Sequence, residues 1–126
     1  RGWTTVGDTQ TWLRLGVKAS CERWGVSSSA ATAYANSVTL GSNAMETIAM
    51  EKWVDMFLQG FDSWTEWRRL DYPVLSPPSA AITGTGVPVR NGYGGLVPTQ
   101  NKVSYDAAVA AQGADNQDTK LWWDTK

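Results

Sequence analysis

The sequence contains no histidine, and this absence excludes several kinds of site at once. Without an imidazole there can be no Ser-His-Asp triad, no histidine acid–base catalyst and no histidine-ligated zinc ion. The single cysteine, Cys21, cannot form an internal disulfide or a multi-cysteine metal site. We therefore expect Cys21 to be a small buried hydrophobic residue.

The sequence also lacks a long apolar run and an excess of charge of one sign. No apolar stretch approaches the roughly 20 residues that a membrane-spanning helix needs. Eleven Lys and Arg balance twelve Asp and Glu to a net charge of −1, and the basic residues are scattered. A nucleic-acid partner would call for a basic patch or stripe. We expect neither a transmembrane helix nor a nucleic-acid partner.

Tryptophan, by contrast, is abundant. The 126 residues include eight, at positions 3, 12, 24, 53, 64, 67, 122 and 123. The indole ring packs or stacks, and its one N–H needs an acceptor. Such enrichment is typical of carbohydrate-binding proteins and also of helical proteins with wide gaps between helices. We expect most of the eight to pack against other residues and one or two to remain for a ligand.

Apolar periodicity and capping signals predict four helices, so the fold class is mainly α. The first is expected over residues 8–24, with Gly25 as the glycine that ends it. The second begins at Asn43, where Glu46 three residues later completes a capping box, and ends at Gly60. Both have one apolar face and one polar face, which predicts that they are half-buried.

The third helix is expected to begin at Ser63, which forms the S-x-x-E capping box with Glu66. Pro73 limits it to residue 72 or before. Only residues 60–62 would then separate the second and third helices, which predicts a helical hairpin or a sharp corner. A fourth helix is expected over 105–112, after Ser104 as its N-cap.

Two segments, 27–42 and 73–102, lack helical periodicity and are expected to be irregular. The second contains all five prolines, and its stretch VPVRNGYGG, residues 87–95, predicts an extended segment that could form a strand before a glycine turn. Loops longer than about 12–15 residues are uncommon in compact domains. Because so little apolar surface remains, we expect residues 1–126 to be the C-terminal portion of a single larger domain and not an autonomous one.

Acidic residues occur in pairs but match no catalytic or metal-binding pattern. A glycosidase needs two carboxylates at a defined separation, whereas Glu46, Glu51, Asp62 and Glu66 are best interpreted as solvated helix faces and caps. The segment GADNQD, residues 113–118, lacks the spacing and final Glu of an EF-hand loop and is interpreted as a polar turn. We predict no catalytic residue, no metal site and no cofactor.

The stretch GFDSWTEWRRLDYP, residues 60–73, allows two interpretations. As a sugar site, Trp67 would stack on a ring and an arginine would donate to hydroxyls. As a structural corner, Trp64 and Trp67 would lie in the core, Glu66 would cap, and the two arginines would bind carbonyls of the following loop. We favour the structural interpretation.

Four motifs occur in the order found near the C-terminus of SusD/RagB-type proteins, and the chain resembles that family over nearly its whole length. They are LGVKASCERWGV (15–26), AMETIAMEKWVDMFLQGFDSWTEWRRLDYPVL (44–75), VPVRNGY (87–93) and LWWD (121–124). The sequence departs from the family pattern at Gly94, where relatives have a proline, and in the absence of a Glu before Asn101. The resemblance assigns a shared motif, expected to be structural, to Trp53, Trp64, Glu66, Trp67, Arg68, Arg69, Tyr72, Pro73, Trp122 and Trp123.

The resemblance carries over no ligand-binding residue, but it does imply a function. Proteins of this kind are helical lipoproteins exposed on the outer membrane of Bacteroidetes-type bacteria, with tetratricopeptide-like helix pairs in an N-terminal portion. They are not enzymes; they capture oligosaccharides or peptides and act with a SusC-like TonB-dependent transporter. The implied partners are therefore this transporter, a glycan or peptide ligand, and the lipid-anchored N-terminal portion of the same protein.

Two other classes of function remain open. Tryptophans and carboxylates together would also suit a fragment of an all-α glycoside hydrolase, although no motif supports it. A helical scaffold that binds no ligand is the other alternative.

Overall fold

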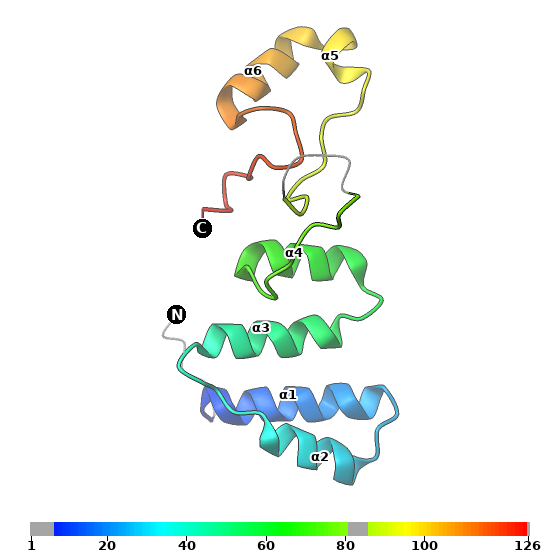
Figure 1. The fold of residues 1–126 in the computed structure, drawn as a ribbon, viewed down its shortest axis with the longest axis vertical. Helices are drawn as coiled ribbons and strands as arrows, with labels where there is room; N and C mark the ends of the chain where they lie inside the picture. The colour runs from blue at the N-terminus through cyan, green and yellow to red at the C-terminus, as the bar shows by residue number, and fades with distance from the viewer. Residues whose placement is uncertain (1–6, 81–85, 126) are drawn as a thin grey trace. The chain divides into compact units, whose positions relative to one another are not determined.

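The computed structural model describes residues 7–80 and 86–125, and in this part of the chain the regular elements are all α-helices (Figure 1). The predicted fold class is thus confirmed. The chain divides into two units, residues 1–73 and 74–126. Within the described residues, no helix is both long enough and apolar enough to cross a membrane. The helices are α1 Thr9–Arg23, α2 Ser28–Ser37, α3 Ala44–Asp55, α4 Gly60–Leu70, α5 Val97–Gln100 and α6 Lys102–Gln112.

Both ends of α1 are set by its own sequence. The Asp8 carboxylate accepts a hydrogen bond from the backbone N–H of Thr11 at 2.7 Å and caps the first turn. At the other end Gly25 takes φ +86°, and the N–H of Val26 donates to the carbonyl of Cys21 at 3.0 Å. This is the Schellman motif, in which a left-handed glycine closes the helix. The predicted limits of this helix are confirmed.

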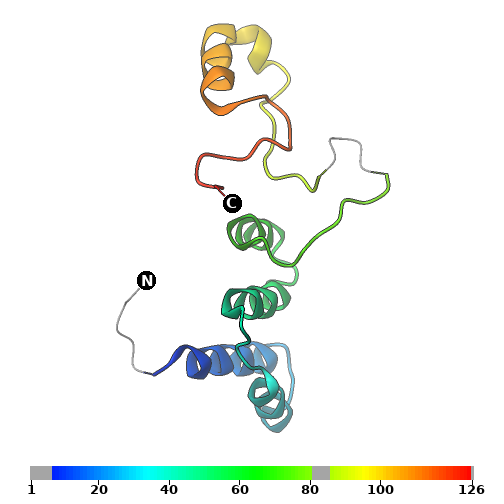
Figure 2. The same ribbon diagram turned by 60° about the vertical axis from the view of Figure 1, so that its left-hand side comes forward.

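The expectation of an irregular segment over 27–42 is wrong, because residues 28–37 form α2. This helix packs against α1 through alanines: Ala31 is 0 % and Ala35 3 % exposed. Small side chains let two helices approach closely, but they leave no stripe of large apolar residues in the sequence. In Figures 1 and 2 α1 and α2 lie side by side as a helical hairpin.

The turn between α3 and α4 also differs from expectation. α3 ends at Asp55, five residues before the expected glycine, and α4 begins at Gly60. Leu58 closes the turn in a left-handed conformation, with φ +69°. Ser63 therefore lies inside α4, where its hydroxyl donates to the Met56 carbonyl at 3.4 Å, and the predicted Ser63–Glu66 capping box is wrong. α3 and α4 form a second helical hairpin, and α1 contacts α3.

The C-terminal end of α4 agrees with the prediction. The helix stops at Leu70, and Asp71 takes a left-handed conformation with φ +59°. The Asp71 N–H still donates to the Trp67 carbonyl at 2.7 Å. Because Pro73 follows, the chain cannot continue as a helix.

Unit 2 contains α5 and α6 in otherwise irregular chain. The described part of VPVRNGYGG contains no strand, so the suggestion of a strand there is wrong. α5 interrupts the segment expected to be irregular, and Pro98 occupies its first turn, where a missing N–H costs nothing. α6 begins at Lys102, so Ser104 lies inside it and is not its N-cap; the helix ends at Gln112 as expected.

The apolar core lies in unit 1 and is small. Among the described residues its buried members are Val17, Ala31, Ala35, Val38, Ala49 and Leu70. Cys21 is half-buried and not fully buried, and it packs against the cluster formed by Val17, Ala35 and Val38.

Candidate functional site

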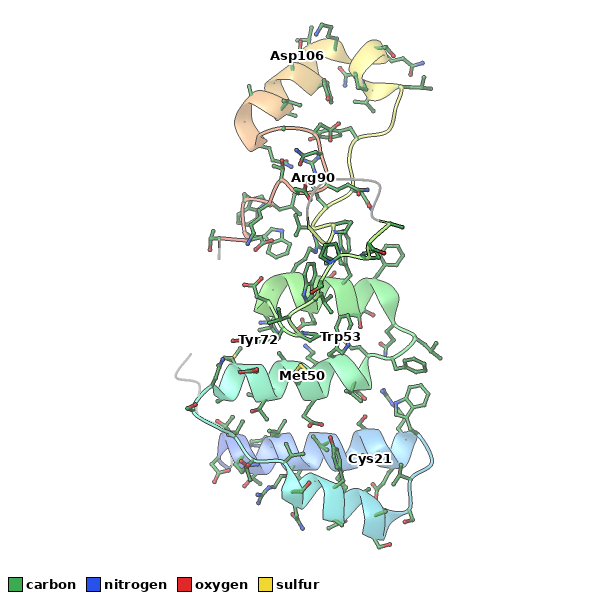
Figure 3. All side chains as sticks on the ribbon, viewed as in Figure 1. Cys21, Met50, Trp53, Tyr72, Arg90 and Asp106 are labelled. Atoms are coloured by element: carbon green, nitrogen blue, oxygen red, sulfur yellow. The ribbon has the colours of Figure 1, made fainter. Side chains whose placement is uncertain are left out.

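Three tryptophans from α3 and α4 line a hollow of about 470 Å³. Trp53 comes from α3, where Figure 3 labels it, and Trp64 and Trp67 come from α4. All three are half-buried and do not lie in a closed core. We call this the tryptophan hollow; its other lining residues are Met56, Phe57, Leu58, Gly60 and Ser63.

The groups on α4 that could bind a sugar already have partners within unit 1. The Trp67 indole N–H donates to the Pro73 carbonyl at 3.0 Å, so it ties the chain after the helix back to α4. The Arg68 guanidinium, in a side chain that is almost buried, lies 3.8 Å from the centre of the Trp64 ring. A cation at this distance covers one face of the indole and is held by it.

Glu66 links two helices and does not cap one. Its carboxylate lies 2.8 Å from the Lys52 amine of α3 and 2.5 Å from the Arg69 guanidinium. The hydrogen bond from Arg69 and, after it, that from Lys52 lower the pKa of Glu66, against the opposing effect of burial. The Asn43 side chain also donates to the Tyr72 hydroxyl at 2.7 Å, which connects the start of α3 to the end of α4.

The structure thus gathers the eight motif residues of unit 1 around the α3–α4 hairpin. The remaining two, Trp122 and Trp123, lie in unit 2, where Trp122 is 86 % exposed and Trp123 is half-buried. Trp12 and Trp24 are each 51 % exposed, and the Trp24 ring packs edge-on against Phe57. Trp3 lies outside the described residues.

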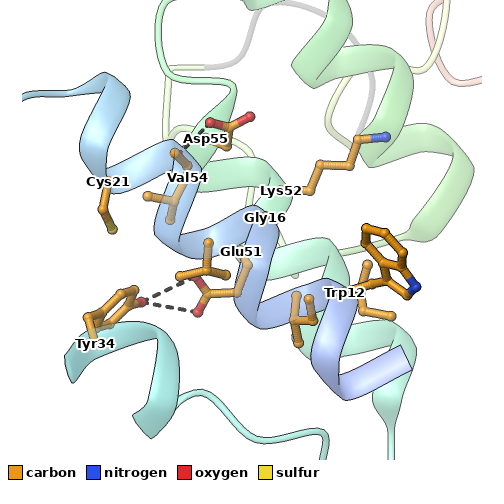
Figure 4. A pocket seen from close by; sticks show the side chains of 12 residues that line it. Trp12, Gly16, Cys21, Tyr34, Glu51, Lys52, Val54 and Asp55 are labelled. Carbon is orange, nitrogen blue, oxygen red and sulfur yellow. Dashed lines mark hydrogen bonds between the residues drawn. The ribbon is translucent and has the colours of Figure 1, made fainter. Parts of the chain in front are cut away.

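Sequence reasoning missed a second cavity, of about 260 Å³, between α1, α2 and α3. At one side the Tyr34 hydroxyl donates to the Glu51 carboxylate, at 3.1 and 3.3 Å from its two oxygens (Figure 4). Burial, followed by the carboxylate, raises the pKa of Tyr34, so the hydroxyl remains a donor. We call this the Tyr34 pocket; its lining also includes Trp12, Leu13, Gly16, Val17, Ser20, Cys21, Ile48, Lys52, Val54 and Asp55.

Two of the three charged side chains that line the Tyr34 pocket are paired with residues outside it. The Asp55 carboxylate lies 2.5 Å from the Arg23 guanidinium and also accepts from Ser20 at 2.5 Å, which ties α1 to α3. The Lys52 amine pairs with Glu66 of α4. A flat indole, Trp12, stands on the side of the pocket away from Tyr34 (Figure 4).

Unit 2 is organised around a carboxylate from the segment interpreted as a polar turn. Asp115 accepts hydrogen bonds from the Arg90 guanidinium and the Tyr93 backbone N–H, both at 3.1 Å, and from the Tyr105 hydroxyl at 3.3 Å. The Asp115 carboxylate therefore accepts its hydrogen bonds from groups of the protein itself. Among the described residues, no group of three His, Cys, Asp or Glu side chains could hold a metal ion.

Comparisons with known proteins agree with this fold. One family, SusD-like, described as starch-binding and associating with the outer membrane, matches residues 1–94. No curated protein matches. A solved structure named Bacteroidetes AC2a SusD-like is 27 % identical to this chain, with a TM-score of 0.80. The match covers 97 % of this chain and 27 % of the chain in that structure.

Two further structures are similar. A chitin-binding protein is 27 % identical, with a TM-score of 0.81 and coverage of 96 % of this chain and 29 % of its own. A chitin-binding SusD homolog from Flavobacterium johnsoniae is 24 % identical, with a TM-score of 0.77. The match covers 100 % of this chain and 33 % of that one, and at this identity it supports the fold and nothing further. This chain therefore spans about a third or less of these structures. Because the family match covers 94 of the 126 residues, the chain belongs to the SusD-like family.

Proposed function

We propose that this chain is the C-terminal portion of a cell-surface protein that captures oligosaccharides and delivers them to a TonB-dependent transporter without catalysis. The observation that carries the proposal is the match of residues 1–94 to a family described as starch-binding and associating with the outer membrane. One similar solved structure, 27 % identical, is named as a chitin-binding protein. Chitin and starch are therefore the first polysaccharides to test, and peptides are the alternative cargo.

We propose that the motif residues on α4 stabilise the α3–α4 hairpin and do not bind the ligand, and their contacts support this structural role. The Trp67 N–H is used by the Pro73 carbonyl, and one face of Trp64 is covered by Arg68. Glu66 holds α3 and α4 together through ion pairs to both helices. A sugar that used these groups would first have to displace intramolecular partners, which costs the hydrogen bonds they make.

The binding experiment uses the full-length protein that contains this chain. Calorimetry with chitin oligosaccharides and with maltooligosaccharides should give a dissociation constant in the millimolar range or tighter for at least one of them. Arg69→Gln, whose side chain is 50 % exposed, should leave this constant within about twofold if the motif is structural. Absence of binding to both glycans and to a peptide mixture would contradict capture and favour a helical scaffold.

The same incubation tests for catalysis. After prolonged contact with each polysaccharide, the concentration of reducing ends should stay at that of the protein-free control. An increase that depends on protein concentration would instead support a glycoside hydrolase, which needs two suitably spaced carboxylates.

Partnership and location are tested in the native cell. We expect the protein to be surface-exposed, anchored by a lipid in its N-terminal portion, and bound to a SusC-like transporter. Purification from detergent-solubilised outer membranes should recover the transporter together with the protein. Recovery of the protein alone, from the soluble fraction, would contradict this part of the proposal.

A further inference from the structure

The Tyr34 pocket contains one carboxylate that no described residue balances with an opposite charge. Asp55 and Lys52 each form an ion pair with a residue outside the pocket. Glu51 accepts a hydrogen bond from the Tyr34 hydroxyl, which is a neutral donor. None of the ion pairs among the described residues includes Glu51. The pocket therefore presents one uncompensated carboxylate in a space bounded by α1, α2 and α3.

The rest of the lining is suited to a small ring. Leu13, Val17 and Ile48 supply an aliphatic wall, and Trp12 supplies a flat aromatic face opposite the side of Tyr34 (Figure 4). Drug-sized ligands occupy pockets of about 300–1,000 Å³. A cavity of about 260 Å³ is smaller than that and suits a single sugar ring.

The floor of the pocket is open because α1 has a glycine there. Gly16 lines the cavity, and a Cβ built on it would meet no atom within 4 Å. Glycine in a helix interior is less stable than alanine by about 1 kcal/mol. A larger residue at this position would extend into the space that the ring needs.

We propose that the Tyr34 pocket binds a hexosamine unit, with the protonated amine on the Glu51 carboxylate and the ring against Trp12. A neutral ligand would strip water from Glu51 without supplying an opposite charge, and this costs free energy. A protonated amine replaces that water with a charge-assisted hydrogen bond, which is among the stronger hydrogen bonds in proteins. The Tyr34 hydroxyl, already bonded to Glu51, fixes the carboxylate in place. The inference rests on the proposed function only in taking the ligand to be a saccharide.

The test compares two monosaccharides that differ in the charge of one group. Binding of glucosamine and of N-acetylglucosamine to the full-length protein is measured by NMR titration, at a pH where the free amine is protonated. Glucosamine should bind more tightly. Glu51→Gln should weaken glucosamine binding by about ten- to a hundredfold, the effect of losing a hydrogen bond to a charged group. The same variant should not weaken binding of N-acetylglucosamine, because the uncompensated charge that opposes a neutral ligand is gone.

Two further variants separate the pocket from general effects of charge and folding. Glu46→Gln makes the same change on α3 at a residue outside the pocket lining and should leave glucosamine binding unchanged. Gly16→Leu should abolish binding of both sugars without loss of helical circular dichroism. Cys21 lines the pocket, so glucosamine should also slow its alkylation, measured by peptide mapping.

Equal affinity for the two sugars, or a Glu51→Gln variant that binds glucosamine normally, would overturn the inference. Tighter binding of lysine amide than of glucosamine would also overturn it, because the ligand would then be a peptide amine. If chitin or starch oligosaccharides bind while the pocket variants change nothing, the inference fails and the proposed function stands. If no saccharide of any kind binds, both fail.

Discussion

Two glycines at the middle and the end of α1 should respond to the same substitution in opposite directions. Gly16 lies inside the helix and Gly25 just beyond it, and a Cβ would meet no atom within 4 Å at either position. Steric contact with neighbours is therefore the same, and only the backbone conformation differs. Gly16 is helical, whereas Gly25 has φ +86°.

The expected magnitudes follow from this difference. Gly16→Ala should stabilise α1 by about 1 kcal/mol, the difference in helix propensity between the two residues. Gly25→Ala should destabilise it by about 1–2 kcal/mol, because a side chain in the left-handed region brings Cβ close to the following carbonyl oxygen. The two variants should thus differ by about 2–3 kcal/mol.

Hydrogen exchange of the α1 amides, followed by mass spectrometry in the full-length protein, measures both effects locally. A change of 1 kcal/mol alters the opening equilibrium by about fivefold. Exchange should therefore slow in Gly16→Ala and accelerate in Gly25→Ala. If both variants shift exchange in the same direction, the assignment of a helical and a left-handed glycine would be refuted.

Three further changes test other features. The Arg69 hydrogen bond lowers the pKa of Glu66 from its ordinary 4.5, so the stability this carboxylate adds is complete above that value and is lost as the pH falls through the lowered one. Glu66→Gln should reduce the melting temperature at pH 7, as expected for a loss of about 0.5–1 kcal/mol in stability. This loss should shrink as the pH falls below 4.5, and a loss that stays the same at every pH would contradict the ion pairs. Asp115→Asn should cost about 3 kcal/mol in chemical denaturation, because the Arg90 side chain, 6 % exposed, keeps its charge and loses its carboxylate; a loss below about 1 kcal/mol would argue against a buried pair. Leu58→Gly should raise the melting temperature, by relief of about 1 kcal/mol of left-handed strain at a residue 81 % exposed, and a lower melting temperature would show that the side chain matters more than its φ.

The parts of the fold that could be predicted from the sequence are those set by local chemistry. The limits of α1 follow from Asp8 and Gly25, which act on the backbone of their own helix. α2 could not be predicted in the same way. It is stabilised mainly by contact with α1 through Ala31 and Ala35, and such contacts leave no strong periodic signal.

The α3–α4 turn shows how one residue can mislead. Gly60 was expected to stop a helix, but it is the first residue of the next one, and Leu58 takes the left-handed conformation usually given to glycine. Once the start of α4 is placed three residues too late, Ser63 falls at the N-cap position. The sequence alone cannot show that a non-glycine residue such as Leu58 adopts a strained left-handed backbone conformation.

The candidate site was predictable only where its residues are close in sequence. The motif around Trp64 and Trp67 was recognisable because its members lie on one hairpin. Tyr34 and Glu51 are seventeen residues apart, and one of them lies on a helix that was not expected. Their contact depends on the packing of three helices, and no spacing rule within one helix can predict it.

The polar organisation of unit 2 has a thermodynamic consequence. Its buried residues in the described ranges are Arg90 and Asp124, whereas the buried alanines belong to unit 1. Exposure of apolar surface raises the heat capacity on unfolding, and exposure of polar surface lowers it. Local unfolding around Asp115 and its hydrogen-bond partners Arg90, Tyr93 and Tyr105 should therefore have a small heat-capacity change. The free energy of this local unfolding should depend on temperature with less curvature than the free energy of unfolding the α1–α2 hairpin.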